Sequence, residues 1–482
     1  MRILITLTAA ALLGACAIGT DYKRPPVDTP AAFRDALAAS GKPLAELAWW
    51  ELYRDPVLEK LVKVALVQNF DVRIAMARVE EYRALAGVAN IGSIPLISAG
   101  GNATRNAYST VGPTPFPSTF PTVNQSYTPN LTVSYEIDFW RRVADLQAAA
   151  RAQLLATEYA RETTRITVIA NVASAYFALR TQDRELAVTQ RSVAAREKFA
   201  VLTRAQFARG VVSALDLTRA EANVAAARAT VSDLQRQITQ SENLLQVLLG
   251  QNPAPILREA ATEGALLPES PEVPTGLPSA LLERRPDLRQ AENNLISANA
   301  QLKSVKASLF PTISLTGSLG STSATLANLF TGPSKVWTLG LSALQPLIDP
   351  TRNFYQVDAY SAREKQAILS YQQAVVQAFR EVSDALAARQ GYAEFERAQQ
   401  DQVKSLREAQ QLVMKRYASG YSSYFEVIDA DSTLLNAELQ LALAQQNNLL
   451  ALVQLYKALG GGWQQVAADA PKAADAAADA SH

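Results

Sequence analysis

The amino-acid sequence predicts a mixed α and β fold, made mainly of long α-helices and built from two internal structural repeats. Residues 206–250 can be laid over residues 416–460 without a gap, at an offset of 210 positions. Upstream, residues 71–101 lie over residues 287–317 at an offset of 216 positions. In both halves the hydrophobic period is helical, then alternating, then helical again. Self-similarity at this spacing indicates one supersecondary plan used twice.

The N-terminus begins with a short apolar segment. In MRILITLTAAALLGAC one arginine precedes an apolar run that is too short to span a bilayer, so residues 1–15 are predicted to be a secretory signal peptide. LLGAC resembles a bacterial lipobox, which predicts that Cys16 becomes the acylated first residue of the mature chain. The alternative is an ordinary signal peptide cut nearby, with Cys16 discarded. Ala17 and Ile18 follow without an aspartate, which by the rule for such lipoproteins favours the outer over the inner membrane.

Composition narrows the classes of function. The 482 residues carry 46 basic and 45 acidic side chains, and a net charge of +1 without clusters of one sign argues against a nucleic-acid partner. Cys16 is the one cysteine, so no internal disulfide is possible, and the one histidine is His482. Histidine-based catalysis and the usual zinc ligand sets are therefore disfavoured. We expect no catalytic residue, no metal site and no cofactor apart from a covalent lipid on Cys16.

The first repeat is placed at residues 56–250. Residues 71–93 are alanine-rich and helical in period, and Pro95 ends that helix. A β-hairpin is predicted over 95–139, because apolar and polar residues alternate on both sides of a loop rich in turn formers. A helical hairpin follows over 141–250.

The second repeat, at residues 287–462, follows the same order. A helix is predicted over 287–309 and ends at Pro311. A β-hairpin is placed at 311–348 and a helical hairpin at 351–460. The two repeats therefore supply two strand pairs and two helical hairpins.

Three further segments lie outside the repeats. Residues 16–55 are predicted to be a lipidated N-terminal segment, and residues 251–286 a proline-rich linker. Residues 463–482 are of low complexity and are predicted to be disordered.

Each helical hairpin combines a very long helix with a shorter return helix. We expect the long helices at about 141–206 and 351–416, and the return helices at about 216–249 and 426–459. Apolar residues of the second long helix are spaced by three and four, which indicates a coiled-coil-like seam.

The turn at the end of each hairpin is itself repeated. FARGVVSALDLTRA, residues 207–220, aligns with YASGYSSYFEVIDA, residues 417–430. Gly210 and Gly420 are expected to end the long helices in the left-handed conformation, with Ser213 and Ser423 next in the turn. Backbone geometry alone would explain these glycines.

The four strands have the length of outer-membrane strands, about nine to eleven tilted residues. The second is placed at 127–140, with Phe139 on its apolar face. Four strands cannot close a barrel, and an open edge in lipid would leave backbone groups unsatisfied. Several chains would therefore share one barrel, and three chains would supply twelve strands. The alternative is a soluble protein whose strands pack on themselves. No segment after the signal offers 18 consecutive apolar residues, so no membrane-spanning helix is expected.

The chain resembles the TolC-like outer membrane efflux protein family, and within it the NodT-type lipoproteins that work with RND pumps. The resemblance covers about residues 12–462 and is carried by the motifs LLGAC, WWELYRDPVLEKLVKVALVQNFDV, LPSALLERRPDLRQAENNLISANAQL, SLFPTISLTG and RYASGYSSYFEVIDADSTLLNAELQLA. It implies a homotrimer with a twelve-strand outer-membrane β-barrel, continued by a periplasmic α-helical barrel and an equatorial domain.

The resemblance also implies a function and its partners. The trimer would be the exit duct of a tripartite RND-type efflux system, passively conducting drugs or other small molecules across the periplasm and the outer membrane. A periplasmic adaptor would dock at the helical tips, around residues 207–218 and 417–428, and an inner-membrane RND pump would supply the energy. The protein would be anchored in the outer membrane by its lipid and would extend into the periplasm.

The second tip matches the closed periplasmic end of the family. By this resemblance Phe425 would form an apolar constriction and Asp429 an acidic ring, with Glu426 at the position of a further acidic ring. Charged rings at a narrow mouth concentrate one sign of ion, and a narrow hydrophobic ring excludes water. The alternative is that Phe425 packs in a core and that Asp429 is an acid favoured at a helix start.

Three other functions stay open from the residues. One is an outer-membrane exit duct for protein secretion, and another is a non-pore periplasmic coiled-coil lipoprotein. The paired strand segments argue against the second. A secreted enzyme is disfavoured by the absence of internal histidine and of a convincing catalytic cluster.

Overall fold

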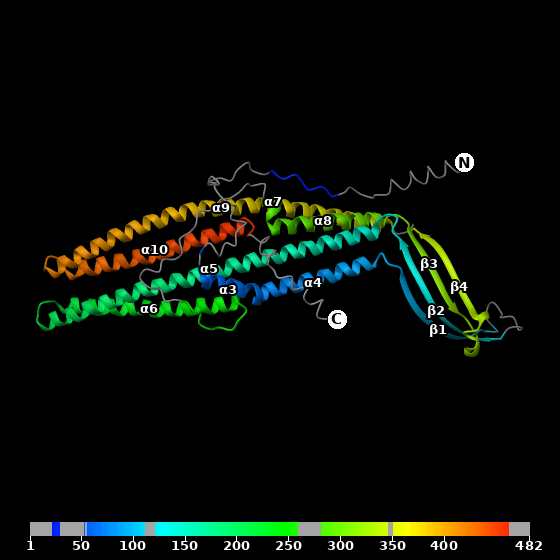
Figure 1. Ribbon diagram of the computed structural model, residues 1–482, viewed down its shortest axis with the longest axis horizontal. Coiled ribbons are helices and arrows are strands. Elements are labelled where there is room, and N and C mark those ends of the chain that lie inside the picture. Colours follow the sequence, from blue (N-terminus) through cyan, green and yellow to red (C-terminus); the bar gives the residue numbers. More distant parts are fainter. Residues whose placement is uncertain are drawn as a thin grey trace. The chain divides into compact units, whose positions relative to one another are not determined.

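The computed structural model describes residues 22–28, 53, 55–109, 111, 121–258, 281–345 and 350–461. The chain divides into two compact units. Unit 1 holds residues 1–26, 79–157 and 290–371, and unit 2 holds residues 27–78, 158–289 and 372–482. Helices α4, α5, α8 and α9 contribute residues to both units. The order along the chain is α3, α4, β1, β2, α5, α6 and then α7, α8, β3, β4, α9, α10 (Figure 1).

Unit 1 contains a four-stranded antiparallel sheet with the order β1-β2-β3-β4 (Figure 1). The strands are β1 (Leu96–Ala107), β2 (Val123–Ile137), β3 (Thr312–Ser321) and β4 (Lys335–Leu344). β2 and β3 come from different halves of the sequence and pair from Asn130↔Gly320 to Ile137↔Ile313. Within the described residues, β1 and β4 each have one neighbouring strand, so each leaves one edge unpaired.

Cross-strand pairing separates the sheet into an apolar and a polar face, because directly paired residues share a face. The apolar face includes Ile97, Ala99, Leu131, Val133, Tyr135, Ile137, Ile313, Leu315, Leu319, Trp337, Leu339 and Leu341, and at one end of the strands it also holds the polar residues Arg105, Gln125, Ser321 and Lys335. The polar face includes Ser98, Gly100, Asn102, Thr104, Asn106, Asn124, Ser126, Thr128, Asn130, Thr132, Ser134, Ser314, Thr316, Ser318, Gly320, Thr338, Gly340 and Ser342, with Leu96, Val336 and Leu344 at strand ends.

Charge on the polar face is confined to one position of the four described strands. Glu136, near the end of β2, pairs there with Ser314 and accepts two hydrogen bonds from the Arg142 guanidinium, at 2.9 and 2.6 Å. The apolar face stays uncovered within the chain: Trp337 is 75% exposed and Leu339 is 70% exposed. A sheet with an exposed apolar face needs an apolar environment or another molecule against it.

An aromatic and hydrogen-bonded cluster marks the passage from strand to helix in unit 1. The Trp140 indole stacks on Phe310, with centroids 4.8 Å apart, and its Nε1 donates to the carbonyl of Pro311 at 2.8 Å. Two serines of α8 (Pro286–Ala307) then tie that helix to α5 (Arg142–Ala208). Ser304 donates to the Arg142 carbonyl at 2.8 Å, and Ser297 donates to the Ala149 carbonyl at 3.0 Å.

Unit 2 is built from helices that share one hydrophobic core. Its members come from α3 (Pro56–Gln68), the middle of α5, α9 (Pro350–Ala418) and α10 (Tyr424–Ala458), and include Leu58, Tyr176, Phe177, Val382, Leu452 and Tyr456. The α3 start is fixed by Asp55, whose carboxylate accepts the N–H groups of Val57 and Leu58, with a proline as the first helical residue. The same carboxylate accepts the Tyr176 hydroxyl at 2.6 Å.

Two helical hairpins complete unit 2. α5 returns as α6 (Ala214–Leu248), and α9 returns as α10. Figure 1 shows both pairs, and Val403 of α9 packs in one cluster with Leu434, Ala437 and Leu441 of α10. The short helices α7 (Leu281–Arg284), η3 (Leu326–Asn328) and η4 (Gly332–Ser334) lie in connections. The remaining helix, α4, spans Phe70–Ile91.

The predicted helices lie within two residues of the observed bounds, and the strand predictions need two corrections. β2 starts at Val123 and ends at Ile137, so Phe139 lies beyond the strand in the turn before α5. The reason is that Asp138 caps α5 and draws the chain out of the sheet: its carboxylate accepts the N–H groups of Val143 and Ala144. The helix α3 was not predicted. Cys16, residues 259–280 and the tail 463–482 lie outside the described residues.

Two features are absent from the described residues. No helix there combines the length and the apolar character needed to cross a membrane. Nor does that part of the chain gather three or more His, Cys, Asp or Glu side chains in a geometry that could hold a metal ion.

Candidate functional site

The candidate site comprises the two helical tips of unit 2 and the contacts behind them. At the first tip α5 ends in a Schellman motif. The Gly210 N–H donates to the Phe207 carbonyl and the Val211 N–H to the Gln206 carbonyl, both at 2.9 Å. Gly210 has a φ of 71°, and this left-handed conformation favours glycine although no atom crowds the position.

The second tip repeats this geometry at the end of α9. The Gly420 N–H donates to the Tyr417 carbonyl at 3.0 Å, and the Tyr421 N–H donates to the Arg416 carbonyl at 2.9 Å. Gly420 has a φ of 76°. Both glycines are thus helix terminators, as the sequence predicted.

Each return helix then starts with a capping box. Ser213 accepts the Asp216 N–H at 3.3 Å, while the Asp216 carboxylate accepts the Ser213 N–H at 3.1 Å. At the second tip Ser423 accepts the Glu426 N–H at 3.4 Å, and the Glu426 carboxylate accepts the Ser423 N–H at 3.2 Å. These reciprocal bonds satisfy helix-start donors that would otherwise lack partners.

The capping bonds also set the ionisation of the two acids. Hydrogen bonds from the Ser213 side chain and then its backbone lower the pKa of Asp216. A hydrogen bond from the Ser423 backbone is the main cause that lowers the pKa of Glu426. Both carboxylates are therefore firmly negative near neutral pH.

Phe425 and Asp429 lie four positions apart and thus on one face of α10. Phe425 is 69% exposed within the chain, so it does not pack in the core of its own chain. Asp429 is exposed too, and among the described residues it makes no hydrogen bond or ion pair. Glu426 differs from Asp429, because its carboxylate already closes the capping box.

Aromatic contacts hold the second tip against the first hairpin. The Phe199 ring of α5 lies edge-on to Tyr417 of α9, with centroids 5.9 Å apart, and 6.1 Å from the Tyr424 ring of α10. Tyr424 also packs against Ala220 and Val224 of α6. Burial raises the pKa of Tyr424, so its hydroxyl stays protonated. All four long helices of unit 2 therefore meet behind the second tip.

A polar ladder, defined here as three contacts between α5 and α10, continues from these aromatics. Arg184 donates to the Gln445 side chain at 2.7 Å, and Arg191 donates to Glu438 at 3.1 Å. Nearest the tip, Arg196 Nε donates to Asp431 Oδ2 at 2.9 Å. Asp431, Glu438 and Gln445 are seven positions apart, so all three lie on the same face of α10.

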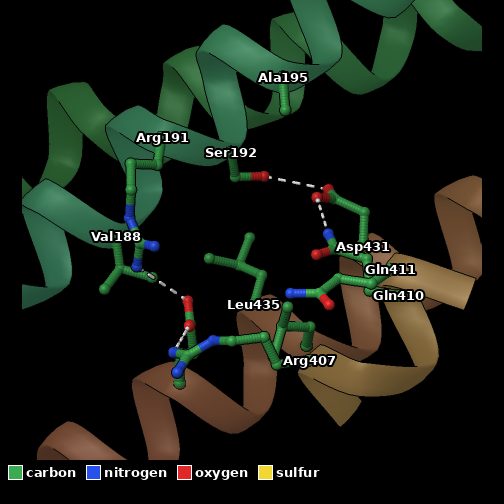
Figure 2. A pocket seen from close by; sticks show the side chains of 11 residues that line it. Val188, Arg191, Ser192, Ala195, Arg407, Gln410, Gln411, Asp431 and Leu435 are labelled. Atoms are coloured by element: carbon green, nitrogen blue, oxygen red, sulfur yellow. Dashed lines mark hydrogen bonds and ion pairs between the residues drawn. The ribbon is translucent and has the colours of Figure 1, made fainter. Parts of the chain in front are cut away.

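The ladder also reaches α9. Arg407 donates to Glu438 at 2.6 Å, and Gln410 donates to Asp431 at 3.3 Å. Figure 2 shows Ser192 of α5 pointing at Asp431, to which it donates at 3.1 Å. The cavity beside these groups measures about 340 Å³. The carboxylates that line it, on Asp431 and Glu438, are both paired with arginine. The cavity is therefore a space between helices crossed by ion pairs and not a charged binding pocket.

The sequence reasoning missed this ladder. Its signal was present in α10, where polar residues recur every seven positions beside the apolar seam of Leu434 and Leu441. The partners on α5 could not be assigned, because they depend on how two helices more than 200 residues apart are paired.

A sequence model of the family described as "Outer membrane efflux protein" matches residues 61–251 and again residues 277–461. The chain belongs to the outer membrane efflux protein family. Its two matched segments each contain one strand pair and one helical hairpin.

This outer membrane efflux protein has long relatives that match nearly end to end. The "Probable efflux pump outer membrane protein TtgC" of Pseudomonas putida is 33% identical over 486 residues, which cover 97% of this chain and 99% of the relative. The "Cation efflux system protein CusC" of Escherichia coli is 31% identical over 468 residues, covering 96% and 99%. The solved structure of the "Open State of the Neisseria gonorrhoeae MtrE Outer Membrane Channel" is 31% identical in sequence and has a TM-score of 0.83. The match covers 93% of this chain and 98% of that chain.

These relatives are efflux pump proteins and channels, and the protein is accordingly an outer membrane protein of the efflux class. Its mainly helical fold with a small antiparallel sheet is the fold of the solved CusC, with a TM-score of 0.83 over 92% of this chain. The roles of Phe425, Glu426 and Asp429, the docking role of the tips and the acylation of Cys16 stay predictions.

Proposed function

We propose that the protein is the outer-membrane exit duct of a tripartite RND-type efflux system and conducts drugs or other small molecules passively. The two-faced sheet is the observation that supports this most directly. Its apolar face suits lipid, while a face of hydroxyls, amides and glycines suits a water-filled lumen. Antiparallel sheets of soluble proteins commonly bury one face against a core, whereas the described strands of this sheet have no buried face.

The open edges of β1 and β4 support an assembly of several copies. Backbone groups in lipid need partners, so β4 of one copy would pair with β1 of the next until the barrel closes. Three copies give a homotrimer with twelve strands, continued into the periplasm by an α-helical barrel. The relatives are named for antibiotic, toluene and cation efflux, which leaves the transported compound of this protein open within the small-molecule class.

The second tip would be the closed end of this duct. Three copies of Phe425 would form an apolar constriction, and three copies of Asp429 an acidic ring one helical turn further along α10. The exposure of both side chains within one chain supports this, since a gate residue must face the lumen and not its own core. Glu426 would add negative charge beside them, while its capping bonds keep the turn rigid.

A periplasmic adaptor would dock at the tips around Gly210, Ser213, Gly420 and Ser423, and an inner-membrane RND pump would supply the energy. The protein itself would need no cofactor. A lipid on Cys16 would add an anchor in the outer membrane, in support of the barrel.

Single-channel conductance in a planar bilayer tests the proposal. The wild type is compared with the double variant Phe425→Ala/Asp429→Ala. The matched control is Leu215→Ala/Arg219→Ala, at the equivalent positions of the first tip. We expect a mostly closed wild type and control, and a gate variant whose mean conductance rises by about tenfold or more.

Two outcomes would contradict parts of the proposal. Equal conductance of all three proteins would leave a channel but would remove the gate from Phe425 and Asp429. Silence of all three, with membrane insertion verified independently, would favour the non-pore periplasmic lipoprotein.

A further inference from the structure

The segment just after the predicted lipid site is held on α8 by one buried carboxylate. Glu292 has a side chain that is 8% exposed. Its Oε1 accepts Arg24 Nε at 2.7 Å and the Tyr22 hydroxyl at 3.2 Å, and its Oε2 accepts a terminal nitrogen of Arg24 at 2.9 Å. We call this arrangement of Tyr22, Arg24 and Glu292 the N-terminal clamp.

The chemistry of the clamp is specific. The planar guanidinium of Arg24 binds both oxygens of Glu292 in parallel, a geometry that lysine cannot reproduce. Burial raises the pKa of Tyr22, with Glu292 adding to it, so the tyrosine stays a hydrogen-bond donor. Loss of these donors would leave the buried Glu292 carboxylate with fewer partners, which is unfavourable, so Glu292 stabilises this segment on α8.

Chain length converts the clamp into a distance limit. Cys16 precedes Tyr22 by six residues, which span at most about 20 Å when extended. From Glu292 to the end of α8 at Ala307, the helix rises about 22 Å. The reach of Cys16 therefore ends within a few ångströms of the level at which α8 ends.

We propose that Tyr22 and Arg24 are positioning residues for the membrane anchor: by docking on Glu292 they fix the N-terminal segment so that the acyl group on Cys16 enters the membrane level with the base of the sheet. This rests on the proposed acylation of Cys16 and on the proposed membrane position of the sheet. The acyl group and the base of the sheet would then meet the membrane surface at the same level along α8.

The rate of trypsin cleavage reports on the clamp, because Lys23 lies between its two donor residues, Tyr22 and Arg24. Cleavage after Lys23 releases the peptide Cys16–Lys23, whose mass also reports acylation, while the Arg24–Pro25 bond resists trypsin. We measure the rate of this release from the purified full-length protein in nanodiscs. A docked wild type should be cleaved slowly, and Arg24→Ala and Glu292→Gln should be cleaved at least about tenfold faster. Tyr22→Phe should have a smaller effect, since it leaves the bidentate contact between Arg24 and Glu292 in place.

The matched control is Glu136→Gln, which breaks another carboxylate–arginine contact of the same unit. We expect it to leave the rate unchanged. Arg24→Ala keeps the test valid if Glu292→Gln misfolds, because the Arg24 side chain is 36% exposed. Equal rates for wild type and Arg24→Ala would overturn the clamp.

A shortened tether separates positioning from simple packing. Removal of Gly19, Thr20 and Asp21 takes about 10 Å from the reach of Cys16, so lipid insertion and docking would compete. We expect this deletion to speed up peptide release in nanodiscs. We expect the deletion to leave the rate unchanged when it is combined with Cys16→Ser, which removes the acyl site. An unchanged rate in the acylated short-tether protein would overturn the positioning role. A released peptide without acyl mass would overturn the anchor itself while leaving the clamp contacts intact.

Discussion

The α5–α6 tip and the α9–α10 tip place residues 210 positions apart in the same turn. Each has a left-handed glycine, a Schellman motif and a serine capping box, with φ values of 71° and 76° at the two glycines. Their return helices nevertheless present different groups. Leu215 and Arg219 of the first tip occupy the positions of Phe425 and Asp429 in the second.

The glycine and the serine of each tip specify the backbone of the turn, and they do so equally in both copies. The positions that differ carry a basic residue at the first tip and an acidic residue at the second. The gate is proposed for the second tip because of the family resemblance, and this difference in charge supports a role that the first tip does not share.

The same contrast recurs where each return helix ends. Asn69 donates from its amide to the Leu248 carbonyl at 2.8 Å, and its counterpart Arg285 donates to the Ala458 carbonyl at 3.0 Å. The first joint is neutral. The second is ionic, because Arg285 also binds Asp287 and Glu381, at 2.6 and 2.8 Å.

The largest effect should come from breaking the ionic joint. Arg285→Ala removes the hydrogen bond to the Ala458 carbonyl and both ion pairs, while Asp287 and Glu381 stay about a third exposed and keep other donors, so we expect a destabilisation of about 2–3 kcal/mol. Asn69→Ala should cost about 1–2 kcal/mol, since it removes a neutral cap and one hydrogen bond. Thermal denaturation of both variants in detergent measures the ranking. Equal losses would show that the two joints are energetically alike despite their chemistry.

The next effect concerns the charge at the tips. Asp429→Asn should lower the cation-over-anion permeability ratio several-fold, because the acidic ring concentrates cations at a narrow mouth. Arg219→Gln, at the equivalent position of the first tip, should leave the ratio nearly unchanged. Reversal potentials under a salt gradient measure both in one assay. A larger effect of Arg219→Gln would move the selectivity site to the first tip.

The serine caps of the two tips should contribute equally to stability. Ser213→Ala and Ser423→Ala should each cost about 1 kcal/mol, because each removes the same helix-start hydrogen bond. Hydrogen exchange of the first turn of α6 and of α10 measures the local loss. A marked inequality would mean that contacts beyond the cap, such as Tyr424 on Phe199, support one tip more than the other.

The smallest effect is the pH response of these caps. The folded-state pKa values of Asp216 and Glu426 are lowered, so their contribution is complete above the ordinary values of 3.8 and 4.5 and is lost as the pH falls through the lower folded values. The protection factors of both helix starts, which correct exchange rates for their intrinsic pH dependence, should therefore stay constant from pH 7 to about 5 and fall in acid. Asp216→Asn and Glu426→Gln should abolish that acid response. Its persistence in these variants would assign the response to other carboxylates.

Sequence patterns located the helices, the strands and the tips because each depends on local periodicity and turn chemistry. The helix α3 was not predicted, although Asp55–Pro56 is a regular helix start, because the internal comparison of the two halves began at residue 71, after this helix. The extent of β2 was misjudged for a different reason: Asp138 ends the strand by capping α5, a competition that alternation does not reveal.

The candidate site was predictable to the same limit. Phe425, Glu426 and Asp429 were selected through the family resemblance of the second tip, and their roles stay a prediction. The pairing of Arg196 with Asp431, and of Arg24 with Glu292, did not, because each joins residues more than 230 positions apart. Such pairs are fixed by the docking of whole helices, which the local pattern of either partner leaves undetermined.

The two-faced sheet has a consequence for the life of the chain before assembly. Among the described residues, a single copy has an uncovered apolar face and two unpaired strand edges, the features that drive edge-to-edge aggregation. In the proposed trimer, lipid and neighbouring copies would cover both in a single step, so completion of the fold and assembly would be one event. The stability of such a trimer would then depend on the concentration of the protein in the membrane.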